Sequence, residues 1–217
     1  LFFLFSGAPE GTPVFKALSG ICFMFVPFYV ISVFHINSKR VASGIGTSVI
    51  PSSVLLSVLK QLHENSFRYD KTELCCLITG SDYSSRAGAY AFADKYKRLY
   101  RDVPTIFIPI EEITSSKKLS VFFRDGSGTT GSEEIATTIR EAGANLGLKI
   151  KHESHLLGSG AFTPFTKNHF PAGSLGTSKD CTSKCFLVNG EKLSDISKKS
   201  VADIGSLIIE TLNYFDG

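Results

Sequence analysis

Residues 119–151 read LSVFFRDGSGTTGSEEIATTIREAGANLGLKIK, and this stretch decides the fold class. It begins with a short, continuous apolar run at 119–123, which is typical of a buried strand. Apolar residues then recur at helical spacing, at Ile135, Ile139, Ala142 and Leu146. These steps of four, three and four predict an amphipathic helix, and a second strand is expected at 148–151. The stretch therefore predicts a strand–helix–strand unit.

The same alternation runs from residue 41 to the C-terminus. The sequence predicts further helices at 54–62, 84–100 and 201–212, and further strands at 73–79 and 104–110. Strands that alternate with helices at these lengths form right-handed βαβ units. We therefore predict that residues 41–217 form an α/β domain with three α/β/α layers and a mostly parallel central sheet.

The first 36 residues differ in composition from the rest of the chain. They contain eight of the 18 Phe but only one acidic and one basic residue. Residues 17–36 carry no charge, and at ~1.5 Å per residue a helix of this length crosses the ~30 Å apolar layer of a bilayer. We predict a transmembrane segment or hairpin within residues 1–40, with a buried core helix as the alternative. Lys39 and Arg40 follow it, and the positive-inside rule then puts the main domain on the cytoplasmic side.

The composition of the whole chain excludes several classes of protein. The chain has 217 residues, of which 43% are hydrophobic, and its mean hydropathy is +0.12, so it is too apolar to be disordered. Five cysteines are too few for a disulfide scaffold. The 23 basic and 20 acidic residues are scattered along the chain, so we expect no nucleic acid as a partner.

Five segments carry a resemblance to a known family. They are 44–62 (GIGTSVIPSSVLLSVLKQL), 79–89 (TGSDYSSRAGA), 103–113 (VPTIFIPIEEI), 158–165 (GSGAFTPF) and 175–180 (LGTSKD). In this order they resemble segments of the co-catalytic two-zinc aminopeptidases, peptidase family M twenty-eight. The resemblance implies a zinc-aminopeptidase-like (phosphorylase/hydrolase-like) fold. It also implies that the first strands and the first metal-binding His of the family precede Leu1.

The resemblance assigns positions in a metal site, at which this sequence departs from the family. The general-base Glu falls on Asp82, which is one methylene shorter, and one metal carboxylate is retained at Glu111. The other ligand positions fall on Gly46 or Thr47 (bridging Asp), Tyr83 (ligand Glu) and Gly176 (last His). None of these supplies a good zinc ligand. Without a bridging carboxylate, we expect the two-zinc centre to be lost.

The resemblance therefore implies a membrane-anchored relative of zinc metallopeptidases that has lost catalysis and acts in binding or scaffolding. Zinc is the cofactor of the family, but we expect it to be absent or weakly bound here, and we expect no other cofactor. The expected partners are a membrane and a peptide or protein, with Asp82 and Glu111 attracting a peptide ammonium group. The alternative is an active, metal-dependent exopeptidase whose ligands are relocated or lie upstream of this sequence.

Other residues offer competing sites, each with an ordinary loop or surface role as its alternative. Relocated metal ligands could come from His152, His155, His169, Cys181 and Cys185. Positions three apart on a strand face opposite sides, so His152 and His155 would need a turn to bind one metal. The glycine-rich loop 126–131 precedes a helix and could hold an anion. Ser159 lies between two glycines, as in a nucleophile elbow.

Overall fold

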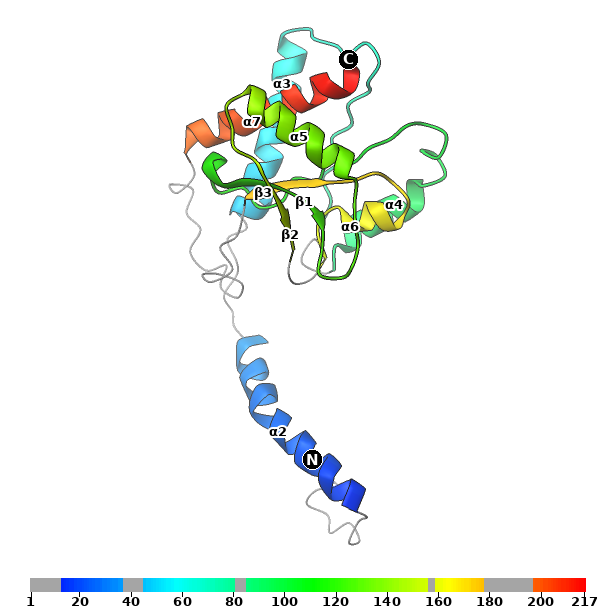
Figure 1. The fold of residues 1–217 in the computed structure, drawn as a ribbon, viewed down its shortest axis with the longest axis vertical. Coiled ribbons are helices and arrows are strands. Elements are labelled where there is room, and N and C mark those ends of the chain that lie inside the picture. Colours follow the sequence, from blue (N-terminus) through cyan, green and yellow to red (C-terminus); the bar gives the residue numbers. More distant parts are fainter. Residues whose placement is uncertain (1–12, 37–44, 81–84, 156–158, 178–196) are drawn as a thin grey trace. The chain divides into compact units, whose positions relative to one another are not determined.

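The computed structural model describes residues 13–36, 45–80, 85–155, 159–177 and 197–217. The chain divides into two compact units, Leu1–Ala42 and Ser43–Gly217, and each is described by itself. In the first unit, the described residues form helix α2 (Pro13–Ile36), which is drawn in blue in Figure 1.

Helix α2 is long and apolar. Its 24 residues correspond to ~36 Å at ~1.5 Å per residue. The side chains described on this helix, at 20–33, are largely exposed; Phe23, Met24 and Tyr29 each expose at least 70% of their surface. The hydroxyl of Ser32 donates to the carbonyl oxygen of Phe28 at 2.7 Å, so this polar group is satisfied within the helix.

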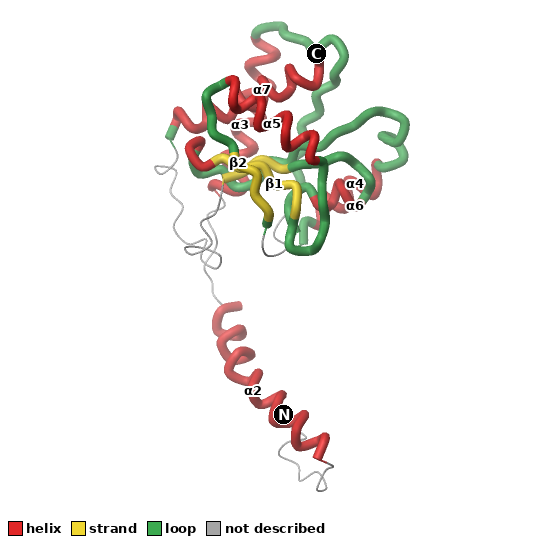
Figure 2. Tube along the Cα trace, in the orientation of Figure 1, coloured by secondary structure: helices red, strands yellow, loops and turns green. Residues whose placement is uncertain are grey.

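The second unit is built from short strands and longer helices (Figure 2). Its elements, in chain order, are η1 (Ile45–Val49), α3 (Ile50–Glu64), α4 (Ala87–Tyr96), η2 (Ser116–Lys118), β1 (Leu119–Arg124), α5 (Glu133–Asn145), β2 (Lys151–Ser154), α6 (Thr163–Lys167), β3 (Ser174–Thr177) and α7 (Lys198–Asp216). The predicted α/β class is confirmed, and three of the predicted helices lie in α3, α5 and α7.

The described strands form a small sheet in the order β2–β1–β3. Strand β1 pairs with β2 in parallel and with β3 antiparallel. Two isolated parallel bridges involve the segment before Glu111. Ile110 pairs with Leu175 in β3, and Phe107 pairs with Ala172, which precedes β3. The predicted parallel pairing therefore holds for β1–β2 and for these bridges, whereas β3 departs from it.

Three predicted strands differ in the structure. The apolar run at 73–79 forms no strand, and the segment 104–110 contributes only the two isolated bridges. The strand predicted at 148–151 begins only at Lys151, because Leu148 N–H donates to the carbonyl oxygen of Gly143 at 2.8 Å and so still belongs to the end of α5.

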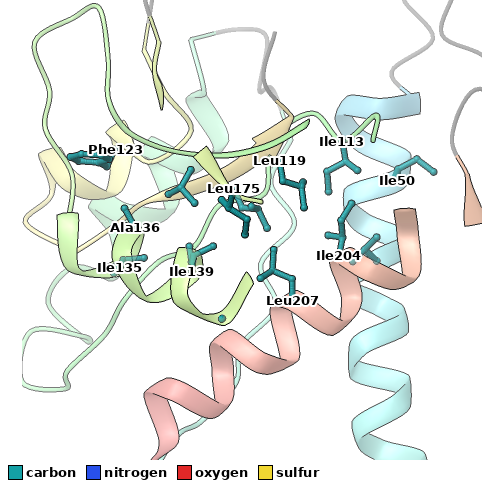
Figure 3. Packing of buried hydrophobic residues seen from close by; sticks show 14 residues of the cluster. Ile50, Ile113, Leu119, Phe123, Ile135, Ala136, Ile139, Leu175, Ile204 and Leu207 are labelled. Atoms are coloured by element: carbon teal, nitrogen blue, oxygen red, sulfur yellow. The ribbon is translucent and has the colours of Figure 1, made fainter. Parts of the chain in front are cut away.

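Alternate side chains of β1 enter two different hydrophobic cores. Leu119, Val121 and Phe123 belong to the larger core, which contains residues of α3, α5 and α7 (Figure 3). Phe122 belongs to the second core, which contains residues of α4 and α6. Since successive side chains of a strand point to opposite faces, helices cover both faces of the sheet.

Among the residues whose side chains the structure describes, one helical segment, Ile45–Glu64, is long and apolar enough to cross a membrane by length and composition. Its residues Ile50, Val54 and Val58 recur every four positions, and all three are buried in the second unit. Ile50 and Val54 belong to the larger core. This pattern is that of a core helix in a globular domain, whose apolar stripe faces other protein elements.

Candidate functional site

The segment that carries Glu111 lies against β3. The N–H of Glu111 donates to the carbonyl oxygen of Leu175 at 2.8 Å, and the N–H of Thr177 donates to the carbonyl oxygen of Glu112 at 2.8 Å. These two bonds lie on either side of Gly176 in the sequence. The backbone therefore places Glu111 beside Gly176, as two positions of one site require.

Two further observations bring the predicted ligand positions together. A Cβ atom added at Gly176 would lie 3.0 Å from the Cβ of Glu111, which is tighter than ordinary van der Waals contact. The carbonyl oxygen of buried Gly46 accepts a hydrogen bond from the N–H of Ile113 at 2.9 Å. Ile113 follows Glu111 by two residues, so this bond brings Gly46, and with it Thr47 in η1, to the segment that carries Glu111. Three of the predicted positions converge, although two of them are glycines.

The carboxylate of Glu111 is bound by donors from within the protein. Its Oε1 atom accepts from the Nε2 of His155 at 3.0 Å, from the N–H of Ala161 at 3.0 Å and from the hydroxyl of Ser174 at 2.6 Å. Burial opposes ionisation of Glu111, but the hydrogen bond and charge of His155, with the bonds from Ser174 and Ala161, outweigh it. The pKa of Glu111 is consequently lowered from 4.5 to about 2.

His155 reaches Glu111 because β2 continues beyond its last paired residue. The N–H of His155 donates to the carbonyl oxygen of Arg124 at 3.0 Å, and its ring stacks on Phe122 with centroids 4.3 Å apart. His152 lies on the opposite face, edge-on to Phe123 at 5.5 Å between ring centroids. The expectation that these two histidines face opposite sides is confirmed, so they do not bind one metal together.

The remaining predicted ligands do not assemble into a site that the structure describes. Among the described residues, no three His, Cys, Asp or Glu side chains gather closely enough to hold a metal ion. Asp82 and Tyr83 lie outside the described residues, as do Cys181 and Cys185. His169 is described and has a left-handed backbone (φ 68°) just after α6.

Sequence reasoning missed Asp125, which follows β1 and binds two separate segments. Its Oδ1 accepts from the N–H and hydroxyl of Ser127, at 3.0 and 2.7 Å, and from the N–H of Thr129 at 2.9 Å. Its Oδ2 accepts from the N–H of Gly160 at 3.1 Å and from the hydroxyl of Thr163. The pattern Asp-Gly-Ser-Gly after an apolar strand is a turn signal that could have indicated this role.

The two other predicted sites have structural roles. Amides of the glycine-rich loop 126–131 do bind an anion, but it is the carboxylate of Asp125 from the same chain. The carbonyl oxygen of Ser159 accepts two bonds from the guanidinium of Arg86, at 3.2 and 3.0 Å. Residues 159–162 lead into α6 through a turn, which is not the strand-to-helix junction of a nucleophile elbow.

Comparisons with known proteins find similarity in structure but not in sequence. No family model and no curated protein matches the sequence. The chain is similar in structure to a zinc aminopeptidase from Bacillus subtilis (TM-score 0.63, 17% identity, 79% of this chain and 42% of that one). It is also similar to the LapA aminopeptidase of Legionella pneumophila (0.62, 9%, 80% and 47%) and to a glutaminyl cyclase from an Acidobacteriales bacterium (0.57, 15%, 80% and 62%).

These likenesses concern the fold, because all three identities are below 20%. The chain spans less than half the length of the two aminopeptidases and less than two thirds of the cyclase. Backbone bonds bring the segments of Gly46, Glu111 and Gly176 together, and the assignment of these positions to a metal site stays a prediction. The second unit of the chain therefore has an aminopeptidase-like α/β fold.

Proposed function

We propose that this chain keeps the fold of the zinc aminopeptidases without their metal-dependent hydrolysis, and that it acts at a membrane by binding or scaffolding. The observation that carries the proposal is the state of Glu111, the one ligand position that retains its carboxylate. Its Oε1 atom is bound by three donors of the protein itself.

The described residues do not fit the zinc pair that the fold implies. Gly46 and Gly176 have no side-chain donor, and the space next to Gly176 is taken by Glu111 and by Phe122, whose Cε2 lies 3.4 Å from an added Cβ. A ligand such as His at 176 would need these neighbours to move. Because zinc sites need three or four closely placed ligands, one retained carboxylate is insufficient.

Helix α2 supports the membrane part of the proposal. Within Pro13–Ile36 the only charged residue is Lys16, close to the N-terminal end, and Lys39 and Arg40 follow the C-terminal end. Large apolar side chains on the described part, such as Phe25 and Phe28, are 63% and 68% exposed. A water-exposed helix with this composition would be unfavourable, whereas a bilayer would cover it on all sides.

The partner that we propose for the second unit is a peptide or protein that binds the former substrate cleft. The interaction would not use Oε1 of Glu111 for a peptide ammonium group, because that oxygen already accepts three hydrogen bonds. Calorimetry with short peptides tests this partner directly. Saturable binding that is weakened by Asp82→Asn supports it, and a lack of any binding heat counts against it.

Metal content and hydrolysis test the loss of catalysis. The full chain is purified in detergent without chelators, its zinc is quantified by mass spectrometry, and hydrolysis of aminoacyl anilides is measured with and without added zinc. An active zinc aminopeptidase assayed in parallel is the positive control. We expect substoichiometric zinc and no hydrolysis; two zinc equivalents together with turnover would instead establish the alternative of a working exopeptidase.

Flotation with phosphatidylcholine vesicles tests the membrane anchor. We expect the unmodified chain to float with the vesicles and Phe25→Lys/Phe28→Lys to float less, because Lys at the centre of a membrane helix costs about 2.5–3.5 kcal/mol. Leu56→Lys/Val103→Lys is the matched control, since it changes two exposed apolar residues of the second unit. Equal flotation of the two variants would contradict anchoring through α2.

A further inference from the structure

Four residues of the candidate site form a hydrogen-bonded cluster around the carboxylate of Glu111. Glu111 follows the segment that is bridged to β3, His155 follows β2, Ser174 is the first residue of β3, and Ala161 precedes α6. The three other residues lie 44, 63 and 50 positions from Glu111 along the chain, and all three bind its Oε1. One carboxylate oxygen therefore joins the Glu111 segment to three segments that follow it by 44 to 63 residues.

Three donors of the protein itself occupy this oxygen. An ionised carboxylate only accepts hydrogen bonds, so Nε2 of His155 must carry a proton where it meets Glu111. A metal-binding His instead presents the lone pair of a neutral nitrogen. A cation at Oε1 would compete with this N–H, the hydroxyl of Ser174 and the N–H of Ala161.

Close packing fixes the partners in this arrangement. The ring of His155 lies on Phe122, with an angle of 18° between the ring planes. A Cβ added at Gly160 would lie 3.1 Å from Cδ2 of His155 and even closer to the ring of Phe162. The hydroxyl of Ser174 also lies 3.4 Å from the carbonyl oxygen of Phe122. The imidazole therefore has little freedom to turn away from the carboxylate.

We propose that Glu111, His155, Ser174 and the amide of Ala161 form a metal-independent structural junction, which fastens the segments around the former metal site in place of a metal ion. The inference goes beyond the proposed function, because it assigns a role to these residues whether or not the chain binds a partner. A two-zinc site would be stabilised by its metals, whereas this junction is complete without them.

The test is thermal unfolding of the full chain in detergent, followed by circular dichroism. Glu111→Gln removes the charge but keeps the shape, and His155→Gln removes the imidazole. Each is expected to lower the melting temperature by about 5–10 °C, because each leaves a half-buried partner without its counterpart. Glu141→Gln and His63→Gln change exposed residues of the same types and are expected to shift it by less than about 2 °C.

A measurement on the unmodified chain tests the inference even if a variant fails to fold, and a double variant tests it where the single variants fold. On the unmodified chain, neither a chelator nor excess zinc should shift the melting temperature. The double variant Glu111→Gln/His155→Gln should lose less than the sum of the single losses, since the two residues stabilise one interaction.

The inference is wrong if zinc raises the melting temperature of the unmodified chain but not of Glu111→Gln, or if Glu111→Gln is as stable as Glu141→Gln. Hydrolysis is measured separately and distinguishes this failure from that of the proposed function. A chain that hydrolyses peptides through ligands elsewhere would leave the junction intact. A chain with no hydrolysis and no effect of Glu111→Gln would refute the junction alone.

Discussion

The carboxylate of Asp125 is predicted to stabilise the fold through its charge, and Asp125→Asn tests this. The side chain is 9% exposed and accepts five hydrogen bonds, which connect the turn after β1 to the segment that leads into α6. An Asn can accept at only one of the two atoms, and its NH2 group would face donors such as Gly160 N–H and the hydroxyl of Thr163. The substitution therefore breaks the connection on one side.

The expected loss of stability in Asp125→Asn follows from the lowered pKa of Asp125. Burial opposes ionisation of Asp125, but the bonds from Thr163, Ser127, Thr129 and Gly160 outweigh it and lower the pKa from 3.8 to about 2. At ~1.36 kcal/mol per pKa unit this corresponds to at most ~2.5 kcal/mol. Because solvent reaches one side of the turn, we expect about 1–2 kcal/mol. A carboxylate with a lowered pKa stabilises the fold above pH 3.8, and this contribution is lost as the pH falls from 3.8 to about 2.

Denaturant unfolding at pH 7 and at pH 2.5 measures this contribution. At pH 7 we expect Asp125→Asn to lower the free energy of unfolding by about 1–2 kcal/mol, and at pH 2.5 the difference from the unmodified chain should largely disappear. Asp102→Asn is the matched control, because Asp102 is exposed and lies in a turn. A loss of the same size at both pH values would refute the reasoning, since the charge would then not be its cause.

Three more substitutions test the packing around the site, each by denaturant unfolding. Gly131→Ala should lower the free energy of unfolding by at least about 1–3 kcal/mol, because the added Cβ would lie 2.2 Å from the carbonyl oxygen of Ala172. Gly80→Ala should lower it less, because the space around Gly80 is open. Phe162→Ala should cost about 3–5 kcal/mol, since this ring is fully buried in the second core. Ser132→Ala should cost about 1 kcal/mol, because its hydroxyl caps the first turn of α5.

The sequence predicts a helix closely where its apolar spacing agrees with the residues at its N-terminal end. Helix α5 has apolar residues at helical spacing, Ser132 as its N-cap and two acids in its first turn, so its position could be predicted closely. The start of β2 could not, because Gly147 adopts a positive φ of 70° and the turn that ends α5 uses the residues up to Leu148. Such a helix end depends on backbone conformation, which apolar spacing does not encode.

Strand direction and strand partners were less predictable than the elements themselves. The sequence of β3 (SLGT) does not reveal that it lies antiparallel to β1, because direction depends on pairing with residues far away in sequence. The run at 73–79 has the composition of a buried strand, yet its described backbone groups form no ladder. Propensity alone indicates only that such a segment suits a strand once a partner is present.

For the candidate site, the sequence suggests positions but not the interactions between them. Motif order placed Glu111 and Gly176 in one site, and backbone bonds bring them together. That His155 would bind Glu111 depends on where β2 ends and on the ring of Phe122 beneath the imidazole. Asp125 was missed for a related reason, because two of its five donors come from residues more than 30 positions away.

Helices α2 and α3 explain why apolar composition alone does not identify a membrane segment. The segment Ile45–Glu64, which includes α3, is apolar enough to span a bilayer, yet Ile50, Val54 and Val58 place one stripe of it in the protein interior. The described side chains of α2 instead remain exposed around the helix. A helix whose apolar stripe already faces other protein elements has no need of lipid. The case for a membrane anchor therefore depends on α2, and on whether charges introduced there release the chain from vesicles.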